Sequence, residues 1–184
     1  YGFVDDLPTE KFDSETGNLA SDVVSPTYYP VWIIHLYHLT DMKEALKRHI
    51  DAWLRACYNT SGAYFWEYNL TSKAKEVRTY IPLDNYFVCP LYLIHAYQIL
   101  GNDTYLNIAK AVVEFCYSKC KATSPLSLPF NALDSLGNLE GNTEVVDGGN
   151  LLEAAVLFYF YGQYFGNETW IQLANNYLPY LFST

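Results

Sequence analysis

The sequence predicts an all-α protein made of three consecutive helical hairpins. The first observation is a repeat: residues 30–37 (PVWIIHLY) return at residues 90–97 (PLYLIHAY). The second is that fully apolar segments alternate with amphipathic ones, and the third is that short turns alternate with long connections. Together they predict first helices at about 27–39, 86–100 and 150–165, and second helices at about 41–57, 103–119 and 167–181.

The first hairpin has clear start signals. Thr27 is suited to cap the first helix, and Pro30 lies in its first turn, where a missing N–H costs little. The second helix begins near Asp41 and is amphipathic, with charged residues mostly opposite an apolar stripe. That stripe consists of Met42, Ala45, Leu46, Ile50, Trp53 and Leu54.

The next two hairpins repeat this division. The segments 86–100 and 150–165 are apolar on nearly every side, apart from Glu153, and such helices are buried all round. The segments 103–119 and 167–181 are amphipathic, and Pro179 interrupts the last turn of the second one. We therefore expect inner helices surrounded by outer helices. The long connections then gather at the N-terminal ends of the inner helices, where any active cleft should lie.

The remaining segments are loops. Residues 1–26 carry turn-forming and acidic residues and are expected to be an irregular lead-in to a helical domain at 27–184. The connection at 59–85 contains two segments of strand character, which predict a small β-hairpin within residues 62–81. A second long connection spans residues 121–149.

Composition excludes several classes of protein. At 184 residues, with 51% hydrophobic residues, the chain can bury a substantial core. A formal charge of −9 argues against a nucleic-acid partner, which requires a basic surface. No uninterrupted apolar stretch predicts a membrane span. We find no zinc-ligand spacing, phosphate loop, nucleotide fingerprint or Ser-His-Asp set, so neither a metal nor a cofactor is expected.

Four glycosylation sequons favour the extracellular space or the secretory pathway. They begin at Asn59, Asn69, Asn102 and Asn167. Chance would supply roughly one or two in a chain of this composition, so the excess is modest. Two of them, at Asn102 and Asn167, also have the composition of a helix start, which is the alternative explanation.

The four cysteines suggest two disulfides. A hairpin that turns at Gly101 places Cys89 opposite Cys116, and Cys57 and Cys120 both end second helices. We therefore expect the pairs Cys89–Cys116 and Cys57–Cys120, although four cysteines allow three connectivities. The alternative is four buried thiols.

Several segments resemble the six-hairpin (α/α)-toroid glycosidases and their relatives, which include endo-mannanases, unsaturated glucuronyl hydrolases and sugar 2-epimerases. Residues 100–106 (LGNDTYL) and the helix after them resemble the hairpin turn of that superfamily. Residues 83–86 (LDNY) resemble the step that opens an inner helix and lines the sugar cleft, and residues 62–68 resemble the glycine-plus-aromatic segment before it. The resemblance covers most of residues 27–181. Only three hairpins are present, so we expect a fragment of a longer toroid, completed by another segment or chain.

The resemblance implies a glycoside hydrolase-like domain that acts on a glycan. Hydrolysis needs two carboxyl groups that flank the scissile bond. Asp84 and Asp147 hold matching positions just before two inner helices, and we predict that they are the catalytic pair. Glu140 and Glu144 are further acids on the same face. The alternative role of an acid before a helix is capping.

The predicted substrate-binding residues lie around these acids. They are Trp66, Glu67, Tyr68, Tyr80, Asn85 and Glu153. The aromatic side chains can stack on sugar rings or simply pack the loops. Glu153 lies in an apolar helix and needs a partner or a shifted pKa, so it can equally belong to a structural pair. His35 and His95 share a repeat position, which suggests a structural layer.

Three functions follow from this evidence. The first is a carbohydrate-active enzyme that uses paired carboxylates in an acidic, aromatic cleft. The second is a secreted, non-catalytic helical-repeat glycoprotein that binds a partner or builds an extracellular assembly, with its acids used as caps. The third is a toroid that binds sugar without catalysis.

Overall fold

The computed structural model describes residues 3–4, 7–8, 23–24, 42–58, 62, 67–69, 75–76, 81–123, 126–134, 137–140 and 148–182. This part of the chain contains five helices: α2 (Lys43–Cys57), α3 (Leu83–Leu100), α4 (Asp103–Thr123), α5 (Gly148–Phe165) and α6 (Glu168–Leu181). They correspond to five of the six predicted helices. The predicted helix at 27–39, with His35, lies outside the described residues.

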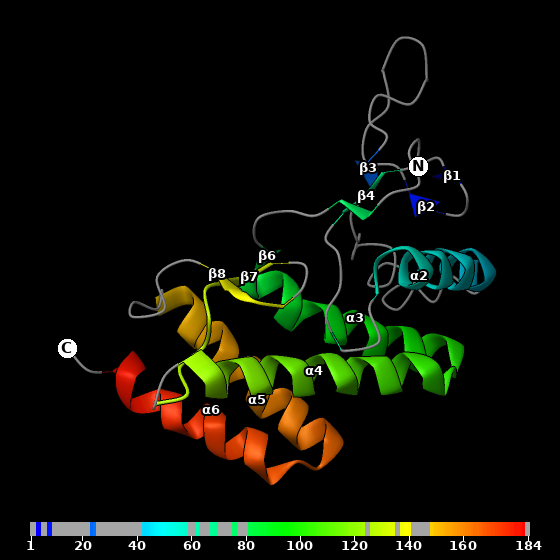
Figure 1. Cartoon of the computed structure of the whole chain (residues 1–184). Helices are drawn as coiled ribbons and strands as arrows, with labels where there is room; N and C mark the ends of the chain where they lie inside the picture. The colour runs from blue at the N-terminus through cyan, green and yellow to red at the C-terminus, as the bar shows by residue number, and fades with distance from the viewer. Residues whose placement is uncertain are drawn as a thin grey trace.

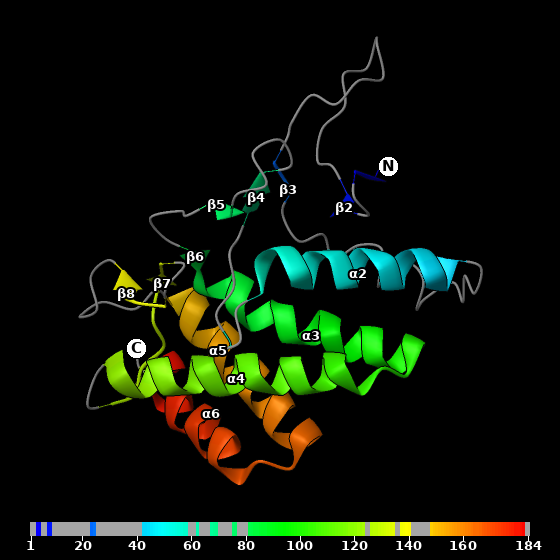
Figure 2. The same ribbon diagram turned by 45° about the vertical axis from the view of Figure 1, so that its right-hand side comes forward.

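The helices form hairpins, as the sequence predicts. The α3 and α4 helices pack antiparallel as one hairpin, α5 and α6 form another, and α3 also packs against α5 (Figures 1 and 2). Among the described side chains of α3, Gln98 alone is exposed, as the prediction of a helix buried on nearly every side requires. The same prediction is wrong for α5, where Leu152, Val156 and Tyr159 are about half exposed. The all-α hairpin fold is therefore confirmed.

Both short turns use the same chemistry. Gly101 and Gly166 adopt positive φ angles of 69° and 66°, which glycine accommodates without steric cost. In the first turn, the Asn102 side chain accepts a hydrogen bond from the Thr104 N–H at 3.1 Å. In the second, Asn167 accepts one from the Thr169 N–H at 3.0 Å. The sequons at these two asparagines thus also act as helix caps.

An aromatic contact joins the two inner helices. Phe87 of α3 meets Phe158 of α5 edge to face, with 4.9 Å between ring centroids. Close by, the Tyr161 hydroxyl donates to the backbone carbonyl of Phe87. A carbonyl oxygen has two lone pairs, so that of Phe87 can accept this bond as well as a helical one, and the buried Tyr161 hydroxyl finds an acceptor in an otherwise apolar interface.

The predicted hairpin within residues 62–81 is present. Strands β4 (Glu67–Asn69) and β5 (Lys75–Glu76) pair antiparallel, with Tyr68 opposite Lys75. Strand β3 (Val23–Val24), from the lead-in, pairs with the other edge of β4. Also within the lead-in, β1 (Phe3–Val4) and β2 (Leu7–Pro8) form a second small pair. The described residues of the lead-in therefore all lie in short strands.

A second three-stranded sheet was not predicted. Strand β6 (Ile81–Pro82) pairs with β7 (Ala132–Leu133), which pairs with β8 (Leu139–Glu140). This sheet lies where α3 begins (Figure 1). The Leu83 N–H donates to the Asn131 carbonyl at 3.0 Å, so the strand leads directly into the helix. Consequently α3 begins at Leu83 rather than near residue 86.

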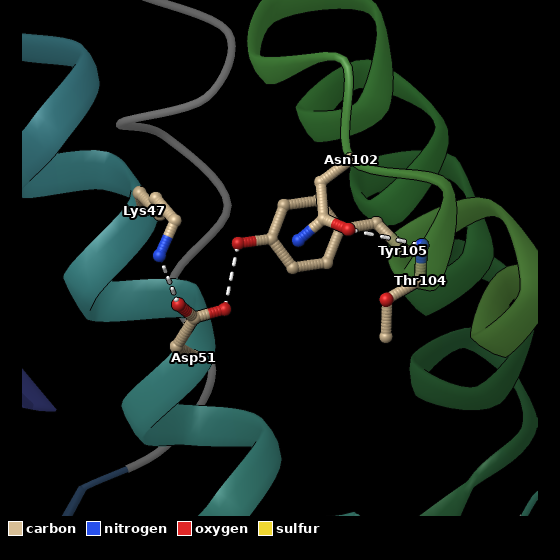
Figure 3. Close-up of polar contacts among 5 residues, drawn as sticks. All are labelled: Lys47, Asp51, Asn102, Thr104 and Tyr105. Atoms are coloured by element: carbon tan, nitrogen blue, oxygen red, sulfur yellow. Dashed lines mark hydrogen bonds and ion pairs between the residues drawn. The ribbon is translucent and has the colours of Figure 1, made fainter.

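Helix α2 is joined to α4 by a polar contact. The Tyr105 hydroxyl donates to an Asp51 carboxylate oxygen at 2.7 Å, and Lys47 contacts the other oxygen at 2.9 Å (Figure 3). Burial raises the pKa of Asp51, but the hydrogen bonds from Lys47 and Tyr105 outweigh it and hold the pKa below its usual value. Burial and the bond to Asp51 raise the pKa of Tyr105. The proton therefore stays on the tyrosine, and Asp51 stays ionised.

The helices also bear on the membrane prediction. Within the described residues, none of the helices is both long and apolar enough to cross a membrane.

Tyr105→Phe should lower the free energy of unfolding by about 1.5–3 kcal/mol near pH 7, because it removes a hydrogen bond to a charged group. Since the pKa of Asp51 is lowered by folding, this contribution is present above the unfolded value of about 3.9 and is lost as pH falls through the folded value. Urea unfolding at neutral pH measures the loss of stability caused by the substitution, and urea unfolding at acidic pH shows whether this loss disappears. Tyr159→Phe, at an exposed side chain of α5, is the control. Equal losses for the two variants would contradict the assignment.

Candidate functional site

The two inner helices start at the same end of the molecule. There, β6 leads into α3, and β8 lies in the long connection that precedes α5 (Figure 1). Sequence analysis places the functional face at this end, because the long connections gather there.

Asn131 joins the starts of these two helices. Its backbone carbonyl accepts the hydrogen bond from the first residue of α3, Leu83. Its side-chain oxygen accepts a hydrogen bond at 3.2 Å from the Asn150 amide, in the first turn of α5. Both asparagines are half-buried. A single residue of the connection therefore fixes the spacing of the two helix starts.

The segment that carries Asn131 is itself anchored in the core. Phe130 and Leu133 are almost fully buried, and the Phe130 ring meets Tyr86 of α3 edge to face at 6.2 Å. The carbonyl of Ser127, which adopts a positive φ of 55°, accepts a hydrogen bond from the Tyr177 hydroxyl of α6 at 2.6 Å. Contacts with both hairpins thus hold this connection in one conformation.

Asp134 closes a tight turn between β7 and β8. One carboxylate oxygen accepts the Asn138 backbone N–H, and the other accepts the Asn138 side-chain amide, both at 2.7 Å. These bonds occupy both oxygens of Asp134, so this acid of the loop face has a structural role.

Both long connections meet α4 at Phe115. Gly62 lies so close that a Cβ atom there would be 2.7 Å from both the Phe115 Cβ and the Ala111 carbonyl oxygen. Gly137 approaches the other end of the ring, where a Cβ would be 2.6 Å from the Phe115 Cζ. Phe115 also contacts Tyr86 of α3, with 5.8 Å between ring centroids. The two connections therefore share one aromatic support beneath the loop face.

The structure describes some of the predicted site residues fully, some by their backbone alone, and some not at all. Asp84 and Asn85 lie in the first turn of α3. Glu67, Tyr68 and Asn69 form β4, and Glu140 ends β8. The structure does not describe the side chains of these six residues. Glu153 lies half-buried in α5. Trp66, Tyr80, Asp147, Glu144 and Asn59 lie outside the described residues. The structure thus places Asp84 at the start of α3 and Glu153 near the start of α5, on neighbouring inner helices.

Glu153 lies within electrostatic reach of Tyr161. Burial raises the pKa of the Tyr161 hydroxyl well above its usual value, and the Cys89 and Cys116 thiols and the Glu153 carboxylate act in the same direction. The hydroxyl therefore remains a hydrogen-bond donor. His95, the described member of the predicted histidine layer, is half-buried in α3.

The cysteines do not form the predicted disulfides. Cys89, Cys116 and Cys120 are buried thiols outside any disulfide, so neither Cys89–Cys116 nor Cys57–Cys120 is formed in this structure. Burial raises the pKa of Cys120 to about 12 and that of Cys116 well above its usual value, which keeps both thiols protonated. A protonated thiol packs as a small apolar side chain and is a poor nucleophile for disulfide exchange. The side chain of Cys57, the last residue of α2, lies outside the description.

Metal binding was also considered. In the part of the chain that the structure describes, no group of three or more His, Cys, Asp or Glu side chains could hold a metal ion.

Sequence reasoning missed Asn131, Asn150 and Phe115. Asn150 follows two glycines at a helix start, which is a weak signal for a special position. Nothing near Asn131 or Phe115 in the sequence distinguishes them, because their partners come from remote segments. They emerge only when the two hairpins pack together.

The fold resembles that of known sugar-related enzymes. A D-mannose isomerase structure aligns with 90% of this chain at a TM-score of 0.71 and 14% identity. An α-amylase structure from Clostridium perfringens aligns with 85% at a TM-score of 0.57 and 13% identity. The aligned regions are 44% and 42% of those chains, so this chain spans less than half of either. No protein family and no curated protein sequence matches. At these identities the similarity shows a shared helical-hairpin fold alone, which is consistent with part of an (α/α) toroid.

Gly137→Ala should destabilise the protein by about 2–4 kcal/mol. The positive φ of 80° costs about 1 kcal/mol in any residue with a Cβ, and the clash with Phe115 adds about 1–3 kcal/mol. Gly101→Ala is the matched control, because Gly101 has a φ of 69° but nothing within 4 Å of its Cβ position. It should cost about 1 kcal/mol. Urea unfolding measures both, and equal costs would show that Gly137 is not packed against the ring.

Proposed function

We propose that this chain is part of a carbohydrate-active (α/α)-toroid domain, with its glycan site on the face where α3 and α5 begin. The similar fold of two sugar-related enzymes supports the general class. Of the residues predicted to bind the glycan, Asn85 lies in the first turn of α3, Glu153 lies in α5, and Glu67 and Tyr68 lie in β4. Aromatic rings that stack on sugars and acids that hydrogen-bond hydroxyls suit such a ligand.

We further propose that the reaction is glycoside hydrolysis by Asp84 and Asp147. The observation that carries this proposal is the junction at Asn131, which joins the start of α3 to the start of α5. Asp84 lies in the first turn of α3, and Asp147 directly precedes Gly148, the first residue of α5. Hydrolysis requires two carboxyl groups about 5–10 Å apart, one protonated to assist the leaving group and one ionised as base or nucleophile. We propose that the acids at these two joined helix starts lie within that range.

The remaining predicted residues would bind the sugar. Trp66, Tyr68 and Tyr80 would stack on sugar rings, and Glu67 and Asn85 would hydrogen-bond hydroxyl groups. Glu153, one turn inside α5, would contact the ligand from below. Helix N-termini favour negative charge, so the start of α3 would stabilise an ionised Asp84.

Asp84→Asn and Asp147→Asn should each lower kcat by at least about a thousand-fold and change KM little, because each removes a group that acts in the transition state. The assay measures new reducing ends released from mannose- and glucose-containing oligosaccharides. Asp103→Asn, at an exposed acid at the start of α4, is the matched control and should leave kcat within about two-fold. Hydrolysis that survives the double variant would refute the assignment.

A separate assay tests a second reaction. The higher TM-score with D-mannose isomerase favours sugar isomerisation as an alternative activity of this face. Incubation with D-mannose, followed by chromatography of the sugars, would detect an isomer without new reducing ends. Saturable glycan binding without either reaction would instead identify a non-catalytic sugar-binding domain. No binding to any sugar would favour the partner-binding glycoprotein.

We also propose that the protein is glycosylated in the secretory pathway. In the two described caps, Asn102 and Asn167 use their side-chain oxygens, which leaves the amide nitrogen, the atom that carries a glycan, outside the cap bond. Peptide mass mapping of protein isolated from its producing cells should find glycans on some of Asn59, Asn69, Asn102 and Asn167, with Asn107 as an asparagine outside a sequon. Four unmodified sequons would overturn the proposed localisation.

A further inference from the structure

One face of α5 is largely apolar and open to solvent. Its apolar side chains are between 37% and 57% exposed, and they are Leu152, Val156, Tyr159, Phe160 and Tyr164. Gln163, which is also exposed, follows Tyr159 by four residues, and the half-buried Glu153 precedes Val156 by three, so both lie on the same face. We call these residues together the α5 face. Contiguous exposed apolar side chains of this kind mark an interaction surface.

The outer helix of the same hairpin meets water with a polar face instead. From the start of α6 to Asn176, every exposed side chain is polar, and the set is Glu168, Thr169, Gln172, Asn175 and Asn176. Large apolar side chains over the same turns, such as Trp170 and Leu173, are buried. The hairpin thus has one side suited to solvent, on α6, and another suited to a protein partner, on α5.

The open side of α5 faces away from α3. Phe158, which meets Phe87 of α3, follows Val156 by two residues and therefore points to the opposite side of the helix. The α3 helix is as apolar as α5, yet it exposes only Gln98 among its described side chains, because neighbouring elements pack against it. By the same reasoning, α5 needs a further helix on the side away from α3.

The α5–α6 hairpin has the surface of an internal member of a stack. A stack of helical hairpins ends in one whose outer face is polar, since no neighbour covers that face. The α5 face is not polar, and the two solved structures of similar fold continue for more than half of their chain beyond the aligned region. We propose that the α5 face binds the inner helix of the next hairpin, carried by the same polypeptide. This inference rests on the proposal that the chain is part of a toroid, and it assigns the side on which the toroid continues.

The polar residues of the α5 face favour a helix of different sequence over a second copy of this chain. A different helix can place apolar side chains over the aromatic rings and hydrogen-bond donors opposite Glu153 and Gln163. A second copy would bring another Glu153 to the interface, and residues 122–184 contain no Lys, Arg or His to pair with either carboxylate. The expected partner is therefore a mainly apolar helix with donor side chains opposite these two residues.

The intact mass of the protein isolated from its producing cells, measured after removal of glycans, is the first test. We expect a polypeptide heavier than the 21.1 kDa of these 184 residues by at least one further hairpin. A polypeptide of 21.1 kDa would overturn the proposal.

Val156→Glu then tests whether the face is covered in that natural polypeptide. The 184-residue chain alone should bind the dye ANS, which fluoresces on exposed apolar surface, and Val156→Glu should lower this fluorescence at least about two-fold. In the natural polypeptide the same substitution should instead lower the Tm by about 5 °C or more, because the carboxylate would be buried. Asn107→Glu adds the same charge on the exposed surface of α4 and should change neither quantity. Tyr159→Ser provides a milder second variant, and circular dichroism confirms the fold of each.

Equal Tm values for Val156→Glu and Asn107→Glu in the natural polypeptide would show that the α5 face is open there and would overturn the proposal. So would a dimer of the natural polypeptide that Val156→Glu dissociates, since a second copy would then occupy the face. A covered α5 face without activity on any sugar would support this inference and contradict the proposed glycan site. Sugar hydrolysis by a polypeptide with an open α5 face would do the reverse.

Discussion

Phe87 of α3 and Phe158 of α5 meet edge to face where the two fully apolar helices pack together. Both helices are apolar on nearly every side, so each is stabilised by burial against its neighbours. Burial of one such aromatic side chain contributes about 1.5–3 kcal/mol, and the ring contact adds about 0.5–1.5 kcal/mol. The outer helices α4 and α6 pack against them, although one face of α5, with Leu152, Val156 and Tyr159, stays exposed. The hairpin arrangement is thus the consequence of making two helices almost entirely apolar.

The polar contacts fix the relative positions of the helices and connections, whereas the apolar contacts drive burial. Asn131 spaces the starts of α3 and α5, and Tyr177 holds the Ser127 carbonyl of the same connection. On the opposite side, Tyr105 and Asp51 align α2 with α4. Each bond is modest in net energy, but a buried polar group left without a partner is costly, which selects one arrangement of the elements.

The helices could be predicted because their signals are local. Alternating apolar and amphipathic segments give the hairpins, and the glycine–asparagine turns at 101–102 and 166–167 mark where they reverse. The β6–β7–β8 sheet could not be predicted, because strands of two residues carry no period and exist through pairing. The sequence predicted which face and which acids form the site. It could not predict Asn131, which joins the starts of α3 and α5, because the partners of Asn131 are remote in sequence. The disulfides failed because opposite positions in a hairpin do not decide whether buried thiols are oxidised.

Both long connections pack against Phe115 of α4. Gly62 of one connection and Gly137 of the other press on opposite ends of the same side chain. Gly62 lies against the Phe115 Cβ and the Ala111 carbonyl oxygen, and Gly137 lies against the tip of the Phe115 ring, so two loops about seventy residues apart in sequence rest on one turn of α4. Protein interiors are close-packed, so a larger side chain at either glycine would displace its loop from this turn. Substitutions that adapt either loop to a new ligand must therefore keep its glycine.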